Sequence, residues 1–268
     1  MAIYPTYPGG KRKAFTLSYD DGWPQDRRLI SLMNQYGIKG TFNLNSGDQK
    51  FNDLVDPKKL YKGHEIAVHG LTHGYLDRLS SQNITYEIMK DRENLERVFG
   101  GSVRGFAYAH GVYNDTTIKI LKNCGIKYAR TITSTEGFSI PSDWYCFNPT
   151  CCDDSPKLME LCDIFLNSDP SFAQSELFYV WGHSCFIKNW ETMETLFQKI
   201  GNSKDVWCAT NIEIYDYMSA FQNLVMSVDN RYIYNPTMTT LSLISNTGDF
   251  MRKQEVFEIK PGEELYLA

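Results

Sequence analysis

The sequence lacks any apolar run that approaches the ~18–20 residues needed to span a bilayer. Its first ten residues contain neither the basic start nor the apolar segment of a signal peptide. Runs of lysine or arginine are also missing, and a net charge of −5 argues against a nucleic-acid backbone as the main partner. We therefore expect a cytoplasmic protein with no membrane partner and no nucleic-acid partner.

Paired cysteine motifs are missing too. The seven cysteines are odd in number and do not show the paired spacing of a structural zinc site. Reduced thiols in a cytoplasm are the simplest interpretation of this pattern. The apolar content of 42% and the charged content of 22% are ordinary for a globular protein, and nothing in the composition sets the oligomeric state.

What the sequence does contain is a regular alternation of strand-like and helix-like segments. The apolar residues 13–19 are typical of a buried strand, and the amphipathic segment 25–36, which ends before Gly37, is typical of a helix. Further strands are expected at 40–44, 64–68, 105–108, 125–129, 177–182 and 206–209, and further helices at 57–62, 83–99, 114–123, 156–167, 190–200 and 211–222. The alternation indicates an α/β fold of mostly parallel strands with the helices outside.

The pattern changes at about residue 224. Short β-like runs then alternate with Asn, Gly and Pro turns up to residue 268. Because roughly 45 residues are too few to expect independent stability, we interpret this part as an antiparallel β appendage packed on the larger domain. The predicted boundaries are 1–222 for the α/β domain and 223–268 for the appendage.

Two polar motifs follow strand-like segments and indicate a catalytic metal. Asp20 and Asp21 come directly after the first strand, and His69 and His73 come after the strand at 64–68. Two imidazoles and one carboxylate can bind a divalent metal and leave coordination positions open for water or substrate. The second carboxylate is then free to act as a general base beside metal-bound water.

Two further strand ends carry histidine. His110 follows the strand at 105–108, and His183 follows the strand at 177–182. The carboxyl ends of parallel strands meet at one edge of an α/β fold, and active sites form there. Four polar strand ends on one edge therefore predict a single active site.

In these motifs the sequence resembles the polysaccharide deacetylase family, also known as carbohydrate esterase family 4, with its nodulation-protein deacetylase homology domain. The resemblance covers about residues 13–222. The run Ser18–Gly22 is similar to the family's first motif, Thr-Phe-Asp-Asp-Gly. The run Gly63–His73 is similar to its second, which contains Gly-His-Glu-Ile and the paired histidines. The resemblance implies a distorted seven-stranded β/α barrel, to which the appendage is added.

The resemblance also implies roles for single residues. In the family the first Asp of the pair is the base and the second is a metal ligand, which implies Asp20 as the base. Asp21, His69 and His73 are then the implied ligands. His183 ends a strand as the family's closing histidine does, which implies that it is the general acid.

Two motifs depart from the family's pattern. The third motif normally supplies an arginine that steadies the base, but the matching run 107–111 has none, and Arg104 is the candidate to replace it. His110 stands where the family has a tyrosine whose backbone N–H helps to hold the oxyanion. Only Asp143 and Trp144 remain of the fourth motif. The residues expected to contact the substrate or the oxyanion are Tyr108, His110, Trp144 and Trp181.

The resemblance implies a metal-dependent hydrolase that removes the N-acetyl or O-acetyl group of a carbohydrate. Zn²⁺ is the expected metal, with Fe²⁺, Co²⁺ and Mn²⁺ as alternatives, because affinity order alone does not select the metal in cells. The expected partner is an acetylated carbohydrate. The sequence does not identify the glycan or its length.

Three alternatives fit parts of the pattern. A hydrolase of another carbon–nitrogen bond, in a formamide or a cyclic amide, needs the same metal, base and acid. A non-haem iron oxygenase also uses two histidines and a carboxylate, but Asp20 and His183 then have no role. A catalytically silent sugar-binding relative would need neither residue.

Overall fold

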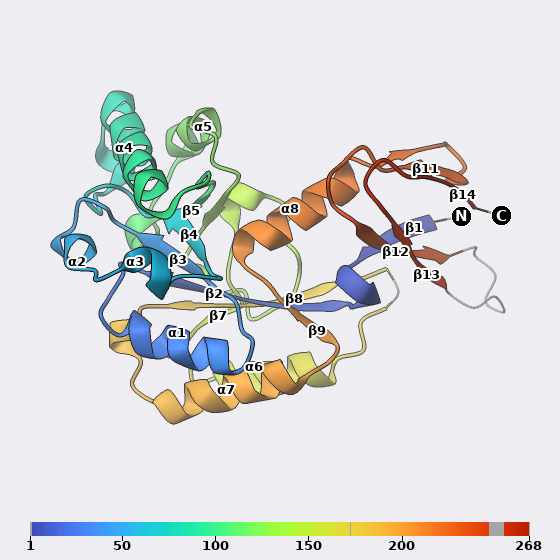
Figure 1. Cartoon of the computed structure of the whole chain (residues 1–268), viewed down its shortest axis with the longest axis horizontal. Coiled ribbons are helices and arrows are strands. Elements are labelled where there is room, and N and C mark those ends of the chain that lie inside the picture. The colour runs from blue at the N-terminus through green and yellow to red at the C-terminus, as the bar shows by residue number, and fades with distance from the viewer. Residues whose placement is uncertain (1, 172, 247–254, 268) are drawn as a thin grey trace.

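A curled parallel sheet forms the centre of the molecule (Figure 1). The computed structural model describes residues 2–171, 173–246 and 255–267. Seven strands pair in parallel, in the order β6 (Tyr128–Arg130), β5 (Gly105–Ala107), β4 (Glu65–Val68), β3 (Thr41–Leu44), β2 (Lys13–Asp20), β8 (Glu176–Gly182) and β7 (Cys151–Cys152). A further strand, β9 (Val206–Cys208), pairs with the start of β2 outside this order. The predicted α/β fold is confirmed.

One segment of the chain links the two edges of this sheet. Phe147 forms a parallel bridge with Arg130 of β6, and β7 begins shortly afterwards beside β8. Between them, the amide of Thr150 donates to the carbonyl of Tyr179 in β8 at 2.7 Å. The sheet therefore curls until its two edges share a neighbour, which produces the distorted barrel.

The central strand β2 is buried along all eight of its residues. Phe15 and Leu17 belong to the main hydrophobic core, whereas Ala14 belongs to a second core. Because successive side chains of a strand point to opposite faces, Asp20 lies on the face of Ala14 and not on that of Phe15. The strand therefore directs Asp20 away from the main hydrophobic core.

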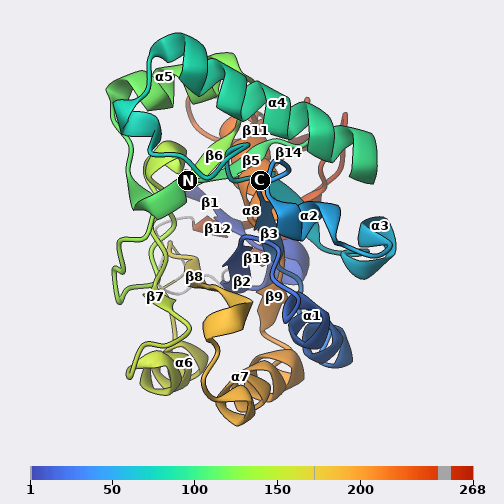
Figure 2. The same cartoon turned by 90° about the vertical axis from the view of Figure 1, so that its left-hand side faces the viewer.

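Amphipathic helices cover the sheet. They are α1 (Asp26–Gln35), α4 (Ser81–Phe99), α5 (Asp115–Asn123), α6 (Leu158–Asn167), α7 (Trp190–Asn202) and α8 (Asn211–Gln222), with the single-turn helices α2 (Gln49–Asn52) and α3 (Pro57–Leu60). Short 3-10 turns are η1 (Pro8–Gly10), η2 (Leu76–Arg78), η3 (Ala109–Gly111), η4 (Trp144–Cys146) and η5 (Ser184–Phe186). Figure 2 shows α4 and α5 on one side of the sheet and α6 and α7 on the other. Within the described residues, no helix is both long and apolar enough to cross a membrane.

Side-chain caps fix where several helices begin. The side chain of Asn114 accepts from the amide of Thr117 at the start of α5. Thr210 and Glu213 form a reciprocal capping box at the start of α8. Such caps satisfy amides that have no partner within the helix, which is why these helices begin close to their predicted first residues.

The C-terminal residues form strands of two small antiparallel sheets. One sheet contains β10 (Val225–Met226), β11 (Tyr232–Tyr234) and β14 (Glu264–Tyr266). In the other, β12 (Leu241–Asn246) lies between β13 (Glu255–Ile259) and β1 (Ala2–Thr6). The predicted antiparallel appendage is confirmed, except that its residues 247–254 and 268 lie outside the described residues.

The N-terminal strand β1 pairs with a strand of the appendage, although it lies on the other side of the predicted division at residue 222. It pairs with β12 along its whole length, from Ala2 opposite Asn246 to Thr6 opposite Ser242. The Thr6 hydroxyl also donates to the carbonyl of Ser242, which is 236 positions away. Pairing across such a distance leaves no local pattern in the sequence.

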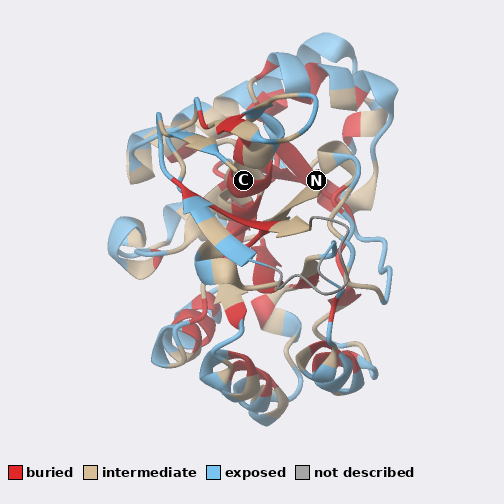
Figure 3. Ribbon diagram, turned by 90° about the vertical axis from the view of Figure 1, so that its right-hand side faces the viewer, coloured by how far each residue is buried: buried red, intermediate tan, exposed pale blue. Residues whose placement is uncertain are grey.

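A second hydrophobic core joins the appendage to the barrel. It combines Ile233 and Leu241 of the appendage with Tyr217 of α8 and with Tyr179 of β8. Figure 1 places the appendage at the end of the molecule where β2 begins, opposite the end where β2 finishes. Figure 3, viewed from the appendage side, shows helices that are exposed on their outer faces and buried toward the sheet. The edge with the polar strand ends is therefore left free of the appendage.

Candidate metal centre and catalytic site

The backbone turns sharply between Asp20 and Asp21 at the end of β2. Asp20 is the last residue of the strand, whereas Asp21 has a φ of 73° and Gly22 a φ of 66°. A non-glycine residue in such a conformation costs about 1–3 kcal/mol and persists only where its surroundings hold it. Here the Asp21 amide donates to the carbonyl of Asn43 in β3 at 2.9 Å. The turn lets both carboxylates approach the same histidine, which neighbouring residues of a straight strand could not do.

His69 and His73 lie on the loop that follows β4. The Nδ1 of His69 is 2.9 Å from the carbonyl of Ala107, so that nitrogen carries the proton and Nε2 is free to bind a metal. The Nε2 atoms of His69 and His73 lie 3.7 and 3.6 Å from Oδ1 of Asp21. Three possible ligand atoms therefore converge.

This set of donors suits one divalent metal. A ligand atom from each of Asp21, His69 and His73 lies within 4.8 Å of the other two. Ligands about 2.0–2.2 Å from a tetrahedral zinc are about 3.3–3.6 Å apart, which is close to the observed 3.6 and 3.7 Å. The mixture of imidazole and carboxylate fits Zn²⁺ and also Fe²⁺, Co²⁺ or Mn²⁺.

A second group of possible ligands is a poorer candidate. It consists of Cys152, Asp153 and Asp154, whose ligand atoms also lie within 4.8 Å of one another. Burial raises the pKa of the Cys152 thiol far above its usual value, and a thiol must lose its proton to bind a metal. Asp154 is exposed. The histidine-containing group is thus the better metal site.

Two acidic residues of α4 hold the loop that carries both histidines. Asp91 is buried and accepts from the amides of Ser46 and His69 at 2.7 and 3.2 Å. Glu87, one turn earlier, accepts from the amide and the hydroxyl of Thr72, both at 2.9 Å. Burial raises the pKa of Asp91 to about 7 although its hydrogen bonds oppose the rise. Sequence analysis missed both acids, and their only signal is that they interrupt the buried stripe of α4.

Arg130, at the end of β6, holds the Asp20 carboxylate. Both side chains are buried, and Nη2 of Arg130 lies 2.6 and 2.5 Å from the two oxygens of Asp20. The side-chain amide of Asn43 donates to the same carboxylate at 2.8 Å. Burial alone would raise the pKa of Asp20, but the charges of Arg130 and two neighbouring histidines outweigh it and hold the pKa below its usual value. Asp20 is therefore ionised at neutral pH and able to accept a proton.

Arg104 does not pair with Asp20, which corrects the expectation that it steadies the base. Its guanidinium donates to both oxygens of Asp216 in α8, at 2.8 and 2.7 Å. Arg104 precedes β5, whereas Arg130 ends β6, so only Arg130 lies at the carboxyl edge of the sheet. The Arg130 guanidinium also lies 4.6 Å over the ring of Trp181, which therefore supports the base indirectly. Sequence analysis missed this pair because its partners are 110 positions apart.

His183 follows β8 and lies beside both carboxylates. Its Nε2 is 3.8 Å from Oδ2 of Asp20 and 3.8 Å from Oδ2 of Asp21. The His183 side chain is 25% exposed, whereas that of Asp20 is 3% exposed. A partly exposed imidazole thus borders the site, where it can exchange protons with a bound molecule.

Asp153 is a further acidic residue that sequence analysis missed. Its amide donates to the carbonyl of Trp181 at 2.8 Å, just before His183. Its carboxylate lies against Gly182, where a Cβ atom would be only 2.3 Å from Oδ2. Burial raises the pKa of the Asp153 carboxyl to about 6, and the neighbouring His183 opposes that rise. A carboxyl group therefore lies beside the segment that carries His183.

Comparison with known proteins agrees with this arrangement. The sequence model of the polysaccharide deacetylase family matches residues 8–129, a range that includes the Asp20–Asp21 pair and both candidate ligand histidines. This part of the chain, residues 8–129, therefore matches the polysaccharide deacetylase family. A chitin deacetylase from Arthroderma benhamiae is 31% identical over 113 residues, which are 39% of this chain and 30% of that protein. The chain spans less than half the length of the curated relatives it matches.

Solved structures of polysaccharide deacetylases share the fold. A Mycobacterium smegmatis protein classed with this family has a TM-score of 0.63 at 19% identity, covering 82% of this chain and 94% of its own. A Bacillus anthracis protein described as a pseudoenzyme of carbohydrate esterase family 4 has a TM-score of 0.51 at 18% identity, covering 80% of this chain and 68% of its own. Because a pseudoenzyme has the same fold, activity must be argued from the residues of the site.

Two side chains expected to contact a substrate pack on hydrophobic cores, Tyr108 fully buried and Trp144 partly buried. Tyr108 is buried, and its hydroxyl donates to the carbonyl of Tyr145 at 3.0 Å. Trp144 lies edge-on against Phe147 and Tyr215, with 5.2 Å between ring centres in each pair, and packs on the second core. Burial in the main core contradicts the expected substrate contact of Tyr108, whereas that of the partly buried Trp144 stays a prediction.

Exposed aromatic rings border the candidate site instead. His110 stacks on Tyr75 with ring centres 3.9 Å apart, and its Nε2 lies 3.1 Å from the carbonyl of His73. Tyr75 is 42% exposed. Phe186, which is 62% exposed, has its ring centre 5.4 Å from that of His183. Flat apolar surfaces therefore lie beside the candidate ligand His73 and beside His183.

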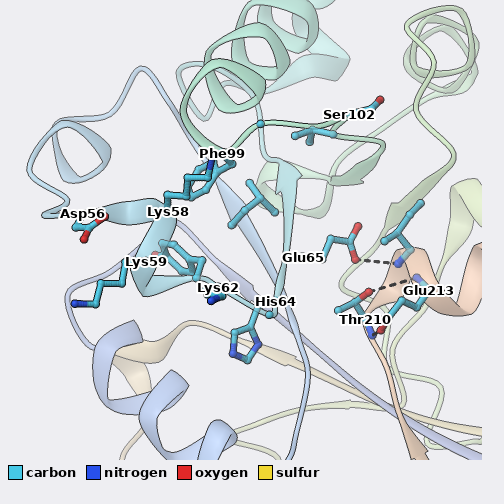
Figure 4. A pocket seen from close by; sticks show the side chains of 16 residues that line it. Asp56, Lys58, Lys59, Lys62, His64, Glu65, Phe99, Ser102, Thr210 and Glu213 are labelled. Atoms are coloured by element: carbon cyan, nitrogen blue, oxygen red, sulfur yellow. Dashed lines mark hydrogen bonds between the residues drawn. The ribbon is translucent and has the colours of Figure 1, made fainter.

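A pocket of about 770 Å³ lies away from this site, where β4 begins (Figure 4). Figure 4 shows Glu65 bonded to the first turn of α8, and Thr210 bonded to Glu213, so the start of this helix is already capped. Burial lowers the pKa of His64, on the pocket wall, to about 4, so this histidine is neutral. The lining contains none of the predicted catalytic or ligand residues.

Removal of one candidate ligand should release the metal. We expect Asp21→Ala and His73→Ala to lose the divalent ion that the wild type retains, because catalytic sites normally need three protein ligands. Elemental analysis after dialysis measures the loss. The control Asp154→Ala removes an exposed carboxylate from the poorer candidate group and should keep the metal. Near-stoichiometric metal in both ligand variants would contradict the site.

The two arginines should differ sharply in their contribution to stability. Arg130→Met leaves Asp20 as a buried, unpaired charge and should lower the free energy of unfolding by about 3–5 kcal/mol. Arg104→Met breaks a pair whose members are 33% and 41% exposed, so the expected cost is about 0–1 kcal/mol. Denaturant titration of both variants measures the difference. Equal costs would contradict the assignment of Arg130 as the partner of the base.

Proposed function

We propose that this chain is a metal-dependent deacetylase that hydrolyses the N-acetyl or O-acetyl group of a carbohydrate. One observation carries the proposal: the buried, ionised Asp20 lies 3.8 Å from His183 and beside three groups that suit a divalent metal. A base, an acid and a metal are the groups that amide hydrolysis uses. The family match and the similarity to a chitin deacetylase support a carbohydrate substrate.

The proposed ligands are Asp21, His69 and His73. A divalent metal supplies two effects in such a site: it lowers the pKa of a water molecule and polarises a carbonyl oxygen. Zn²⁺ is the first candidate, with Fe²⁺, Co²⁺ and Mn²⁺ as alternatives. The Ala107 carbonyl orients the ring of His69, and Asp91 holds its backbone, so the ligand position is prepared by the protein.

Protons move through two side chains in the proposed reaction. Asp20, which Arg130 and Asn43 hold in place, takes a proton from the attacking water as its oxygen bonds to the acyl carbon. His183 then gives a proton to the departing nitrogen or oxygen of the sugar, because an amine or alkoxide leaves poorly without one.

The same geometry bears on the alternatives. A non-haem iron oxygenase would not use Asp20 and His183, which lie 3.8 Å apart, as base and acid. The oxygenase alternative is therefore disfavoured. A silent relative would not need a costly buried ion pair between Asp20 and Arg130. A hydrolase of formamides or cyclic amides would use identical groups. The exposed rings of Tyr75 and Phe186 favour the sugar, since a sugar ring presents flat apolar faces that such rings can cover.

Release of acetate tests the proposal. Zn²⁺-loaded and chelator-treated protein would be incubated with N-acetylated amino-sugar oligomers, O-acetylated sugars, formamides and cyclic amides. We expect acetate from at least one acetylated sugar, loss of that activity on chelation, and recovery when metal is returned. Formate or a ring-opened product without acetate would support the other carbon–nitrogen hydrolase. Sugar binding without any turnover would support the silent relative.

A further inference from the structure

We propose that Asp26 is a positioning residue that keeps His183 in place through Ser184. This inference rests on the proposed function, because it concerns the residue that we propose as the acid. Asp26 lies in the first turn of α1, shortly after the Ser18–Gly22 motif but outside it, and has no role in the reaction as described above.

The Asp26 side chain joins three separate parts of the fold. Its Oδ1 accepts from the Ser184 hydroxyl at 2.5 Å, and its Oδ2 accepts from the Tyr61 hydroxyl at 2.7 Å. All three residues are buried, with exposures of 0%, 1% and 2% for Asp26, Ser184 and Tyr61. Ser184 is the residue directly after His183. A single carboxyl group therefore connects α1 and the segment before β4 to the start of η5.

The His183 side chain, the proposed acid, has few contacts of its own. Within the described part of the chain, no hydrogen bond to the His183 ring is found, and its ring contacts are with Trp181 and Phe186. Phe186 is largely exposed, so one of these contacts is open to solvent. The His183 carbonyl accepts from the amide of Phe186 at 2.9 Å, and the next residue, Ser184, is anchored by a buried, short hydroxyl bond to Asp26.

The unfavourable burial of the Asp26 carboxyl group supports a role in positioning. Burial raises the pKa of Asp26 to about 7, the two hydroxyl bonds oppose the rise, and the nearby Asp20 and Asp21 add to it. A buried carboxyl group close to two other carboxylates is unfavourable, and an apolar side chain could fill the same space at lower cost. The hydrogen bonds to Ser184 and Tyr61 provide what an apolar side chain could not, which is a fixed direction for the chain after His183.

Replacement of Ser184 should affect only the step that uses the acid. A displacement of about 1 Å can cost ~10²-fold when the moved group takes part in the chemistry. We expect Ser184→Ala to lower kcat on an acetamide substrate ~10–100-fold, with KM and bound metal unchanged. On an activated acetyl ester, whose leaving group needs no proton, the rate should stay within about 3-fold of the wild type. Asp26→Asn should show the same selectivity.

A second measurement separates positioning from a loss of stability. In a His183→Ala background, Ser184→Ala should have no additional effect on either substrate, because the group that it positions is gone. The matched control is Ser242→Ala, the same change at a buried serine of the appendage, which should leave the amide-to-ester rate ratio unchanged. If Asp26→Asn does not fold, the milder Ser184→Ala still decides the question.

The outcomes distinguish the two proposals. An active wild type in which Ser184→Ala slows the ester as much as the amide overturns the positioning role and leaves the deacetylase function standing. Additive losses in Ser184→Ala and His183→Ala also overturn it. A metal-loaded wild type that cleaves neither substrate overturns the proposed function, and this inference with it.

Discussion

Asp20→Asn should keep the metal and lower kcat by ~10²–10⁴-fold, the usual contribution of a positioned general base. Asparagine has nearly the same shape, and its single amide oxygen can still accept from Arg130 and Asn43, but Arg130 loses its charged partner, so the variant should also be less stable. It cannot take a proton from water at neutral pH. Turnover of an N-acetylated amino sugar, together with elemental analysis of the same sample, measures both halves of this expectation.

The neighbouring residue provides the matched control for that variant. Asp21→Asn replaces the adjacent carboxylate in the same way, but it should weaken metal binding, because Asp21 is the proposed ligand. Added metal should therefore restore activity partly in Asp21→Asn and not at all in Asp20→Asn. An Asp20→Asn variant with near wild-type turnover would show that the reaction needs no protein base.

His183→Ala should separate amide cleavage from ester cleavage. An amide expels a poor leaving group, so its tetrahedral intermediate needs a proton on nitrogen, and the expected loss on an acetamide is ~10²–10⁴-fold. An activated acetyl ester leaves unaided, so the loss there should be much smaller.

The control for this experiment is a histidine away from the site. His64→Ala removes a ring that packs edge-on against Phe42 with ring centres 5.5 Å apart, at the opposite end of β4 from His69. It should lower stability without altering the amide-to-ester rate ratio. Equal losses on both substrates in His183→Ala would make His183 a structural or binding residue instead of an acid.

Features that repeat locally could be predicted from the sequence. The strand at 13–19, the helix at 25–36 and the helix at 114–123 with its Asn114 cap all appear close to their predicted bounds. Hydrophobic periodicity and capping residues act within a few positions, so one segment is enough to read them. The convergence of Asp20, Asp21 and the two histidines followed from the rule that parallel strands end at one edge.

Features that depend on distant partners could not be predicted in the same way. Arg130 and Arg104 are both arginines next to strand-like segments, and only the three-dimensional register of β5 and β6 shows which one faces Asp20. Likewise, Trp144 is the tryptophan of the Asp-Trp motif. Its ring packs against Tyr215 of α8, which is more than 60 positions away in sequence. The charge and size of a side chain do not show which distant residue it contacts.

The supporting acids form a third category. Asp26, Glu87 and Asp91 sit on helices at positions where the amphipathic pattern calls for apolar residues. A sequence-based interpretation treats each as an isolated irregularity, since its hydrogen-bond partners lie on other elements. Only their burial and their hydrogen bonds show that they hold the loops after β4 and β8. An acidic residue within the apolar stripe of a helix is therefore a candidate for mutation in related chains.

The pairing of β1 with β12 sets an order of events when the chain is made. Residues 2–6 are synthesised before their partners at 242–246, which follow more than 200 positions later. Until then β1 has an unpaired edge, whereas β3 and β4 pair with strands much closer in sequence and can form earlier. A chain cut at residue 222 would never complete that sheet. The appendage is therefore the last part of the fold to close, although it lies far from the site.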